Sequence, residues 1–163
     1  MSEEKDNAGL TTTEKNIIRN TWELVKKDVA GNGYDLFIRF FDENPTYQQL
    51  FKSFKNVPKS ELRGNKRVLA HATNVLYAIS MLVDNIDDTE VLVEMLKKLA
   101  TNHQMRHISY NMFENLKITL VGLLKDKLGS TLMNDEAINA WDKTYNVILS
   151  VVKPVLENVT ENE

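Results

Sequence analysis

The segment most informative about the fold runs from residue 36 to residue 58 and reads LFIRFFDENPTYQQLFKSFKNVP. Its first six residues carry apolar side chains at helical spacing, which predicts a helix. Pro45 suits the first turn of a following short helix, because its missing N–H would be unpaired there anyway. Residues 51–60 predict an irregular segment that nonetheless carries two aromatic side chains, Phe51 and Phe54. We therefore expect an apolar helix that leads into an aromatic corner.

The N-terminal part of the chain predicts one helix before this stretch. Thr11-Thr12-Thr13-Glu14 has the spacing of a capping box, in which side chains satisfy the free N–H groups at a helix start. Apolar residues then recur at helical spacing, namely Ile17, Ile18, Trp22 and Val25. Gly31 and Gly33 are expected to bracket the turn that leads into the next helix.

Further helices are predicted on the C-terminal side. Their expected ranges are about 61–83, about 90–104, 108 to about 129, and about 134 onward. Thr89 is expected to cap the second of them, and Gly129 is a natural C-terminal cap for the third. The first carries one largely apolar face, made by Val68, His71, Val75, Ile79 and Leu82. No alternating strand pattern competes with these helices, so the sequence predicts an all-α fold.

The length and composition are those of one globular domain. The 163 residues are 42% hydrophobic and 26% charged, which is ordinary for a soluble protein with a full core. We expect the domain to cover residues 10–158, with a polar, frayed N-terminal extension over 1–9 and a tail over 159–163. The acidic N-terminus does not match a signal or transit peptide, and the apolar stretches are too short to span a bilayer. We therefore expect a cytoplasmic protein with no membrane partner.

Charge and cysteine content exclude several classes of function. The formal net charge of −3 argues against general attraction to nucleic acid or to anionic membranes. One locally basic stretch, interpreted as a solvated helix face, contains Lys55, Lys59, Arg63, Lys66 and Arg67. The absence of cysteine excludes disulfides, thiolate metal sites and thioether attachment of a cofactor.

Two of the three histidines lie on apolar faces of predicted helices. His71 lies four residues before Val75, and His103 lies four residues after Leu99, so each pair shares one helical face. A single histidine in such a position is more often a hydrogen-bonded core residue than a metal ligand. His107, four residues after His103, suggests a two-histidine metal pair, but no third ligand such as Glu or Asp lies nearby.

The surroundings of these histidines resemble the globin family. Phe40–Pro45 followed by Phe51–Phe54 is similar to the globin run from the second helix through the short third helix. The proline and the first phenylalanine of the corner are its most specific marks. His71 matches the distal histidine of the family, and residues 99–103 match its proximal helix. The spacing from Phe51 to His71 to His103 makes the resemblance specific.

The resemblance covers nearly the whole chain, from about residue 10 to residue 158. Trp22 and Trp141 fall where globins carry tryptophans in the first and last helices, and both are expected to be core residues. The resemblance implies a globin fold of seven to eight helices in a three-over-three arrangement around haem. It also implies haem b, bound without covalent attachment, as the cofactor.

The resemblance implies a role for each site residue. His103 would coordinate the iron as a neutral imidazole, while its other ring nitrogen donates to a nearby backbone carbonyl. His71 would donate a hydrogen bond to bound dioxygen or serve as a sixth iron ligand. Phe51 would stack on the haem. Phe37 and Val75 would crowd the side where gas binds. The remaining apolar wall would be lined by Leu99, Ile108, Phe113 and Ile148.

Three of these assignments have alternatives. Phe54 would touch the haem or only close the corner. His107, with Arg106, would lie near a haem propionate or be a solvated surface histidine. Phe37 would line the gas site or turn its ring into the contact between helices.

Three functions are compatible with this site. The sequence favours reversible binding of dioxygen or another diatomic gas, for storage, local delivery or scavenging, and hence no enzyme activity. Haem redox chemistry on nitric oxide or nitrite would need a separate reductase, because the chain has no room for an appended flavin domain. Gas or redox sensing would have to act through a partner protein. The oligomeric state does not follow from the sequence.

Overall fold

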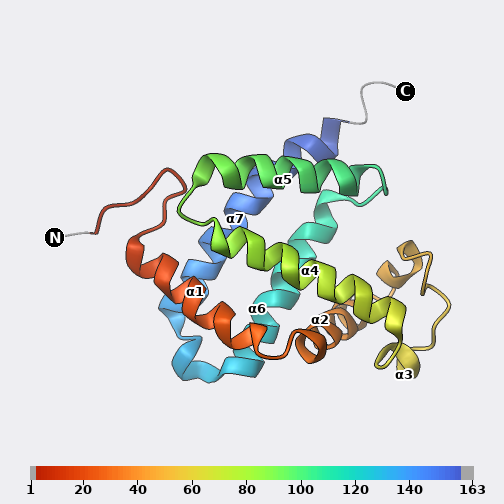
Figure 1. Cartoon of the computed structure of the whole chain (residues 1–163). Coiled ribbons are helices and arrows are strands. Elements are labelled where there is room, and N and C mark those ends of the chain that lie inside the picture. Colours follow the sequence, from red (N-terminus) through yellow and green to blue (C-terminus); the bar gives the residue numbers. More distant parts are fainter. Residues whose placement is uncertain (1–2, 159–163) are drawn as a thin grey trace.

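The computed structural model describes residues 3–158 and confirms the all-α fold (Figure 1). Within that range the chain forms seven α-helices, one 3-10 helix and a single isolated β-bridge. In chain order the elements are α1 (Thr12–Lys26), α2 (Val29–Glu43), η1 (Tyr47–Leu50), α3 (Lys59–Leu62), α4 (Lys66–Asp84), α5 (Thr89–Gln104), α6 (Tyr110–Leu132) and α7 (Asp135–Glu157).

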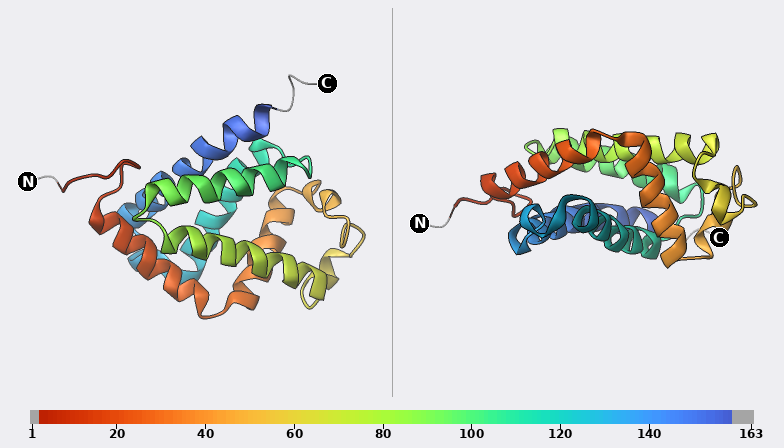
Figure 2. Two further views of the ribbon diagram at one scale, coloured as in Figure 1. Left: turned by 45° about the horizontal axis from the view of Figure 1, so that its top comes forward. Right: turned by 90° about the horizontal axis from the view of Figure 1, so that it is seen from below.

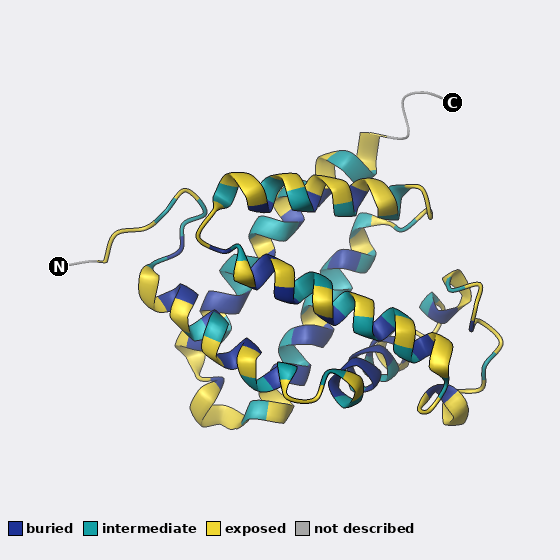
Figure 3. Cartoon of the chain, viewed as in Figure 1, coloured by how far each residue is buried: buried dark blue, intermediate teal, exposed yellow. Residues whose placement is uncertain are grey.

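The long helices are arranged in two layers (Figure 2). In the right-hand view, α1, α4 and α5 lie in one layer and α6 and α7 in the other, while α2 crosses from the first to the second at one end. Helix α2 packs on α4 and α6, and α7 packs on α1, α5 and α6. Buried residues lie on the faces turned between the layers, and exposed residues lie outside (Figure 3). No helix in the described part of the chain is both long and apolar enough to cross a membrane.

Helix starts follow the capping residues closely. Thr11 accepts a hydrogen bond from the Glu14 N–H, and the Glu14 side chain accepts one from the Thr11 N–H, which confirms the predicted capping box. Helix α7 begins where predicted, and Asn134 caps it by accepting from the Ala137 N–H. The cap of α5 is Asp88 rather than Thr89, because the Asp88 carboxylate accepts from the Val91 N–H.

The prediction for Gly31 and Gly33 was wrong, because both lie inside α2. At Gly33 a Cβ atom would lie 3.0 Å from the Cβ of Ala72 on α4. The glycine therefore permits a close crossing of α2 and α4, which fixes how the two helices face each other. Phe37, one turn after Gly33, and His71, beside Ala72, are brought into contact by this crossing.

The predicted helix over 61–83 is in fact two elements. Gly64 has φ +90° and separates α3 from α4, and the Asn65 side chain caps α4 by accepting from the backbone N–H groups of Arg67 and Val68. The most buried face of α4 is also turned by one position from the predicted one. Its fully buried residues include Val68, Ala72 and Leu76, while His71, Val75 and Ile79 are only partly buried.

Two other boundaries differ from expectation. Gly129, with φ +76°, interrupts α6 as expected for a cap, but a further turn follows to Leu132. Residues 3–9 are not frayed, because the Asp6 carboxylate accepts from the N–H groups of Ala8 and Leu10 and pairs with Lys15 at 2.6 Å. The predicted tail over 159–163 lies outside the described residues.

The two tryptophans are core residues, as predicted. Their rings lie 5.8 Å apart, between α1 and α7, and both are almost fully buried. The indole N–H of Trp22 donates to Ser80 at 2.9 Å, and that of Trp141 donates to Thr21 at 3.0 Å. Each buried polar group is therefore satisfied.

Candidate functional site

His103 is held in one orientation near the C-terminal end of α5. Its Nδ1 lies 2.8 Å from the backbone carbonyl oxygen of Leu99, one turn earlier. Because a carbonyl only accepts, Nδ1 carries the proton, and the lone pair of the neutral ring is on Nε2. The ring also meets the edge of Phe113 from α6, with 5.1 Å between centroids. The backbone and one aromatic ring thus leave a single nitrogen of His103 able to bind a metal.

His71 lies on α4 in an aromatic surround. Its ring centroid is 4.8 Å from that of Phe37, 4.9 Å from that of Phe51 and 6.1 Å from that of Phe54. Phe37 comes from α2, and the other two come from the segment between η1 and α3. Among the described residues no hydrogen bond to His71 is found, so its two ring nitrogens are not engaged by the protein.

Both imidazoles favour the neutral form. Burial, and to a smaller extent the electrostatic effects of His103 and Arg106, together lower the pKa of His71 to about 4. Burial also lowers the pKa of His103; the Leu99 carbonyl opposes this shift, and Arg106 adds to it. Neutral imidazole is the form that binds a metal ion. At neutral pH the site therefore presents two uncharged rings, one oriented by its backbone bond and one with unengaged nitrogens.

The corner between η1 and α3 is built by one buried glutamine that the sequence analysis did not single out. The Gln48 side-chain amide donates to the carbonyl oxygens of Phe54 at 3.0 Å and of Val57 at 2.8 Å. These bonds hold an otherwise irregular segment in one shape. Phe54 is buried and stacks on Phe51 at 5.0 Å, so it closes the corner and also approaches His71. No feature of the local sequence distinguishes Gln48 from the adjacent Gln49.

The four remaining aliphatic residues of the predicted site come from three helices and from the segment before α6. All four pack against the main core while keeping part of their surface accessible, and they are Val75 of α4, Leu99 of α5, Ile108 before α6 and Ile148 of α7. Phe37 is buried and contacts Phe40, Phe41 and Phe51 as well as His71. The ring of Phe37 thus contacts His71 and also packs among neighbouring aromatic rings of the core. A position beside the gas site and a position in the contact between helices therefore do not exclude each other.

His107 does not share a helical face with His103. Helix α5 ends at Gln104, and His107 lies in the following turn with φ 57° and an exposed side chain. The spacing argument for a two-histidine pair assumed a continuous helix, which is not present. Within residues 3–158 no group of three or more Asp, Glu, Cys or His side chains is placed to hold a metal ion.

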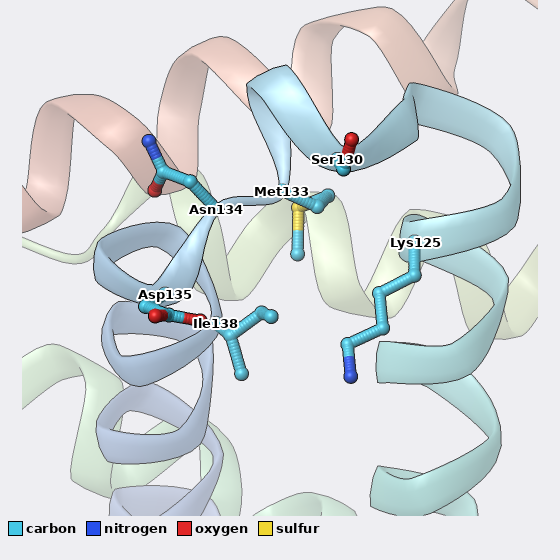
Figure 4. A pocket seen from close by; sticks show the side chains of 6 residues that line it. All are labelled: Lys125, Ser130, Met133, Asn134, Asp135 and Ile138. Atoms are coloured by element: carbon cyan, nitrogen blue, oxygen red, sulfur yellow. The ribbon is translucent and has the colours of Figure 1, made fainter.

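Two surface hollows lie away from the histidines. One, of about 440 Å³, lies at the turn between α6 and α7, where Lys125, Met133 and Ile138 line it with three polar residues (Figure 4). The other, of about 740 Å³, lies over α2, α6 and α7 and is lined mainly by charged side chains such as Arg39 and Lys117. Neither hollow is lined by a histidine. In the second hollow, basic side chains are paired with carboxylates, as in Arg39–Glu43 and Lys117–Asp142. We therefore assign the site to the histidines.

The residues around the histidines fit a haem. A haem iron can be held by one imidazole nitrogen, and the macrocycle packs well in an apolar surround that includes aromatic side chains. His103 supplies such a nitrogen with its orientation fixed. Phe113 contacts the ring of His103, and Phe37 and Phe51 contact that of His71. The four aliphatic residues named above pack against the same core. With no cysteine in the chain, attachment through thioether bonds is excluded.

Comparison with known proteins shows the family to which the chain is similar. The family model Globin matches residues 34–152. A globin of Nerita albicilla is 28% identical over 88% of this chain and 90% of its own length. Globin-1 of Anadara broughtonii is 32% identical over 86% of this chain and 92% of its own length.

Solved structures show the same fold. The haemoglobin of the botfly Gasterophilus intestinalis superposes with a TM-score of 0.82 at 22% identity, covering 90% of this chain and 99% of that one. A globin of Drosophila melanogaster superposes with a TM-score of 0.80 at 25% identity, covering 88% and 93%. Since the family model spans most of the chain and the relatives match over most of their length, the chain belongs to the globin family and is a haem-binding globin.

Proposed function

We propose that this globin binds dioxygen reversibly on a non-covalent haem b, with His103 as the iron ligand and His71 on the opposite side. The observation that carries the proposal is the pairing of two neutral imidazoles with different surroundings. His103 has one nitrogen fixed by Leu99, while His71 makes contacts with aromatic rings and no hydrogen bond within the described residues. A haem held there by His103 would supply an iron that is able to bind a diatomic gas.

The chain's own residues supply three properties to such a site. The Leu99 carbonyl holds His103 in the tautomer that presents Nε2 to a metal, and it increases the basicity of that nitrogen. A neutral His71 carries one N–H, which is able to donate to a polar gas such as dioxygen. Phe37 and Phe51 exclude water beside His71, which strengthens any hydrogen bond made there.

The competing arrangement uses His71 as a second iron ligand, as a redox or sensing globin would. The same unengaged nitrogens of His71 permit it. The absorption spectrum of the reduced protein without gas separates the two arrangements, since one axial imidazole gives a single broad band in the green and two give a pair of sharp bands.

The purified protein is expected to carry one haem b per chain, which acid–butanone extraction removes completely. The reason is the lack of any cysteine for thioether bonds together with the single oriented nitrogen of His103. The measurement is the Soret absorbance before and after extraction. Colour that stays with the polypeptide, or a preparation without a Soret band after expression with ample haem, contradicts the assignment.

Phe37→Ala is expected to change both stability and gas kinetics. Removing this buried ring should cost about 3–5 kcal/mol of unfolding free energy. Because the ring contacts His71, the same change should alter carbon monoxide rebinding after flash photolysis. Phe40→Ala is a matched control, since Phe40 is also buried but contacts Phe37, Phe41 and Tyr47 and not His71. Equal rebinding in the two variants would remove Phe37 from the gas site.

The haem-free protein is expected to lose stability as the pH falls below 6.5. His71 has a pKa of about 4 when folded and 6.5 when unfolded, so unfolding takes up a proton between these values. Above pH 6.5 the titration of His71 does not change the free energy of unfolding. Between pH 6.5 and about 4 that free energy falls by roughly 1 kcal/mol for each pH unit.

Urea unfolding at pH 7.5 and pH 5.5 measures this effect. His71→Leu should lose roughly 1 kcal/mol less than wild type between the two pH values, while His107→Leu, at an exposed histidine, should match wild type. An unchanged pH response in His71→Leu would show that His71 is not held neutral by its surroundings.

A further inference from the structure

One segment of the chain is strongly basic, whereas the remainder is acidic. Residues 52–67 contain six basic side chains and one acidic one. The other 147 residues carry 14 basic against 22 acidic side chains. This asymmetry gives the chain a strong dipole, although its net charge is only −3.

Part of this basic charge is not neutralised within the protein. Lys59 pairs with Asp42, and Arg63 pairs with Asp35. Lys52, Lys55 and Lys66, by contrast, are exposed and have no carboxylate partner within the described residues. The Arg67 guanidinium donates to the backbone carbonyl of Ser53 at 3.1 Å and so keeps its charge. We call these four residues, Lys52, Lys55, Lys66 and Arg67, the basic corner.

The basic corner lies on the outside of the segment that forms the aromatic surround of His71. Arg67 precedes His71 by one turn of α4, and its bond to Ser53 joins α4 to the loop that carries Lys52 and Lys55 (Figure 1). The inward side chains of that loop are Phe51 and Phe54, whose rings contact that of His71. The basic corner and the aromatic surround of His71 are therefore built on the same loop and the first turns of α4.

The corner is also preorganised for binding. The two hydrogen bonds from Gln48 fix the loop, and the bond from Arg67 fixes its link to α4. Leu50, at the end of η1 beside Lys52, is 41% exposed and supplies an apolar contact next to the charges. An apolar contact with a charged rim is the composition of a transient protein–protein interface. A preformed surface loses little entropy on binding.

We infer that the basic corner docks a small acidic electron-carrier protein that returns oxidised haem to the ferrous state. This inference rests on the proposed function, because reversible dioxygen binding requires ferrous iron. One electron passes from the reduced donor to ferric iron; the donor is oxidised by one electron, and no bond or proton changes hands. A small partner protein with a compact acidic patch would contact the basic corner alone. An extended polyanion or an anionic membrane would also face the acidic remainder of this chain and be repelled by it.

The test uses reduced plant-type [2Fe–2S] ferredoxin as the acidic one-electron donor. The triple variant Lys52→Gln, Lys55→Gln, Lys66→Gln removes three charges of the corner without touching the haem surround. Its matched control is Lys27→Gln, Lys98→Gln, Lys125→Gln, three exposed lysines elsewhere that give the same net charge. At low ionic strength the corner variant should be reduced about tenfold more slowly than wild type, and the control should match wild type. The difference should shrink at high salt.

A second readout is binding without electron transfer. Calorimetry with the carbon monoxide complex, which accepts no electron, should show weaker ferredoxin binding for the corner variant alone. Equal rates and affinities in the two triple variants, with normal haem content, would overturn the docking site and leave the proposed function standing. A preparation without a Soret band would overturn both. Binding of phosphatidylserine vesicles or poly(U) RNA that the corner variant abolishes, with ferredoxin reduction unchanged, would also overturn this assignment.

Discussion

His103→Ala is expected to produce a protein that does not retain haem. The substitution removes the one oriented metal-binding nitrogen, and mainly apolar contacts and pairing of the haem propionates would then hold the cofactor. Loss of a residue that only orients a ligand lowers metal affinity about 10–100-fold, so loss of the ligand itself should lower haem affinity by more than about 100-fold. Thermal stability should fall with haem content, because ligand binding contributes to folding free energy. Haem transfer to an excess of apomyoglobin measures the affinity.

Two further variants make this result specific. His107→Ala should keep wild-type affinity, because that side chain is exposed and lies beyond the end of α5. His103→Gly should regain haem and a wild-type spectrum when imidazole is added, since the smaller side chain leaves room for the free ligand. If His103→Ala keeps the wild-type spectrum and affinity without added imidazole, the iron ligand is another residue.

His71→Leu is expected to raise the dissociation rate of dioxygen by tenfold or more. A hydrogen bond from a neutral imidazole to a polar gas in an apolar surround is worth about 1–3 kcal/mol, and about 1.4 kcal/mol corresponds to one decade in rate. Carbon monoxide is far less polar when bound, so its dissociation should hardly change. Stopped-flow displacement of each gas measures both rates.

A conservative replacement separates hydrogen bonding from shape. His71→Gln keeps an N–H donor of similar reach and should raise the dioxygen dissociation rate much less than His71→Leu does. An equal response of both gases to His71→Leu would show that the side chain acts as a steric gate or as a competing iron ligand.

Features encoded by neighbouring residues could be predicted from the sequence. The capping box at Thr11–Glu14 and the cap at Asn134 act through hydrogen bonds to backbone groups three residues away, so the local sequence is sufficient. The bond from His103 to Leu99 lies within one helical turn, and the resemblance to globins implied a backbone acceptor at this place. The aromatic corner was likewise expected from Phe51 and Phe54.

Features that depend on distant contacts could not be predicted. Gly33 is favourable inside α2 only because Ala72 of α4 comes within van der Waals contact of it, and nothing near Gly33 in the sequence indicates that neighbour. The same applies to Gln48, whose amide bonds to the loop depend on how the loop folds back. The break at Gly64 replaced a continuous helix because a cap at Asn65 and a left-handed glycine outweighed the apolar periodicity.

The most direct test of the account is one oxygenation cycle followed by visible absorption. The ferrous protein is recorded under argon, then after equilibration with dioxygen, and again after return to argon. Reversible binding of dioxygen with His103 as the iron ligand predicts a single broad band in the green at first, two bands under dioxygen, and recovery of the first spectrum when the gas is removed. A pair of sharp bands before any gas is added would make His71 an iron ligand. Failure to respond to dioxygen, or conversion to the ferric form instead of recovery, would contradict reversible dioxygen binding.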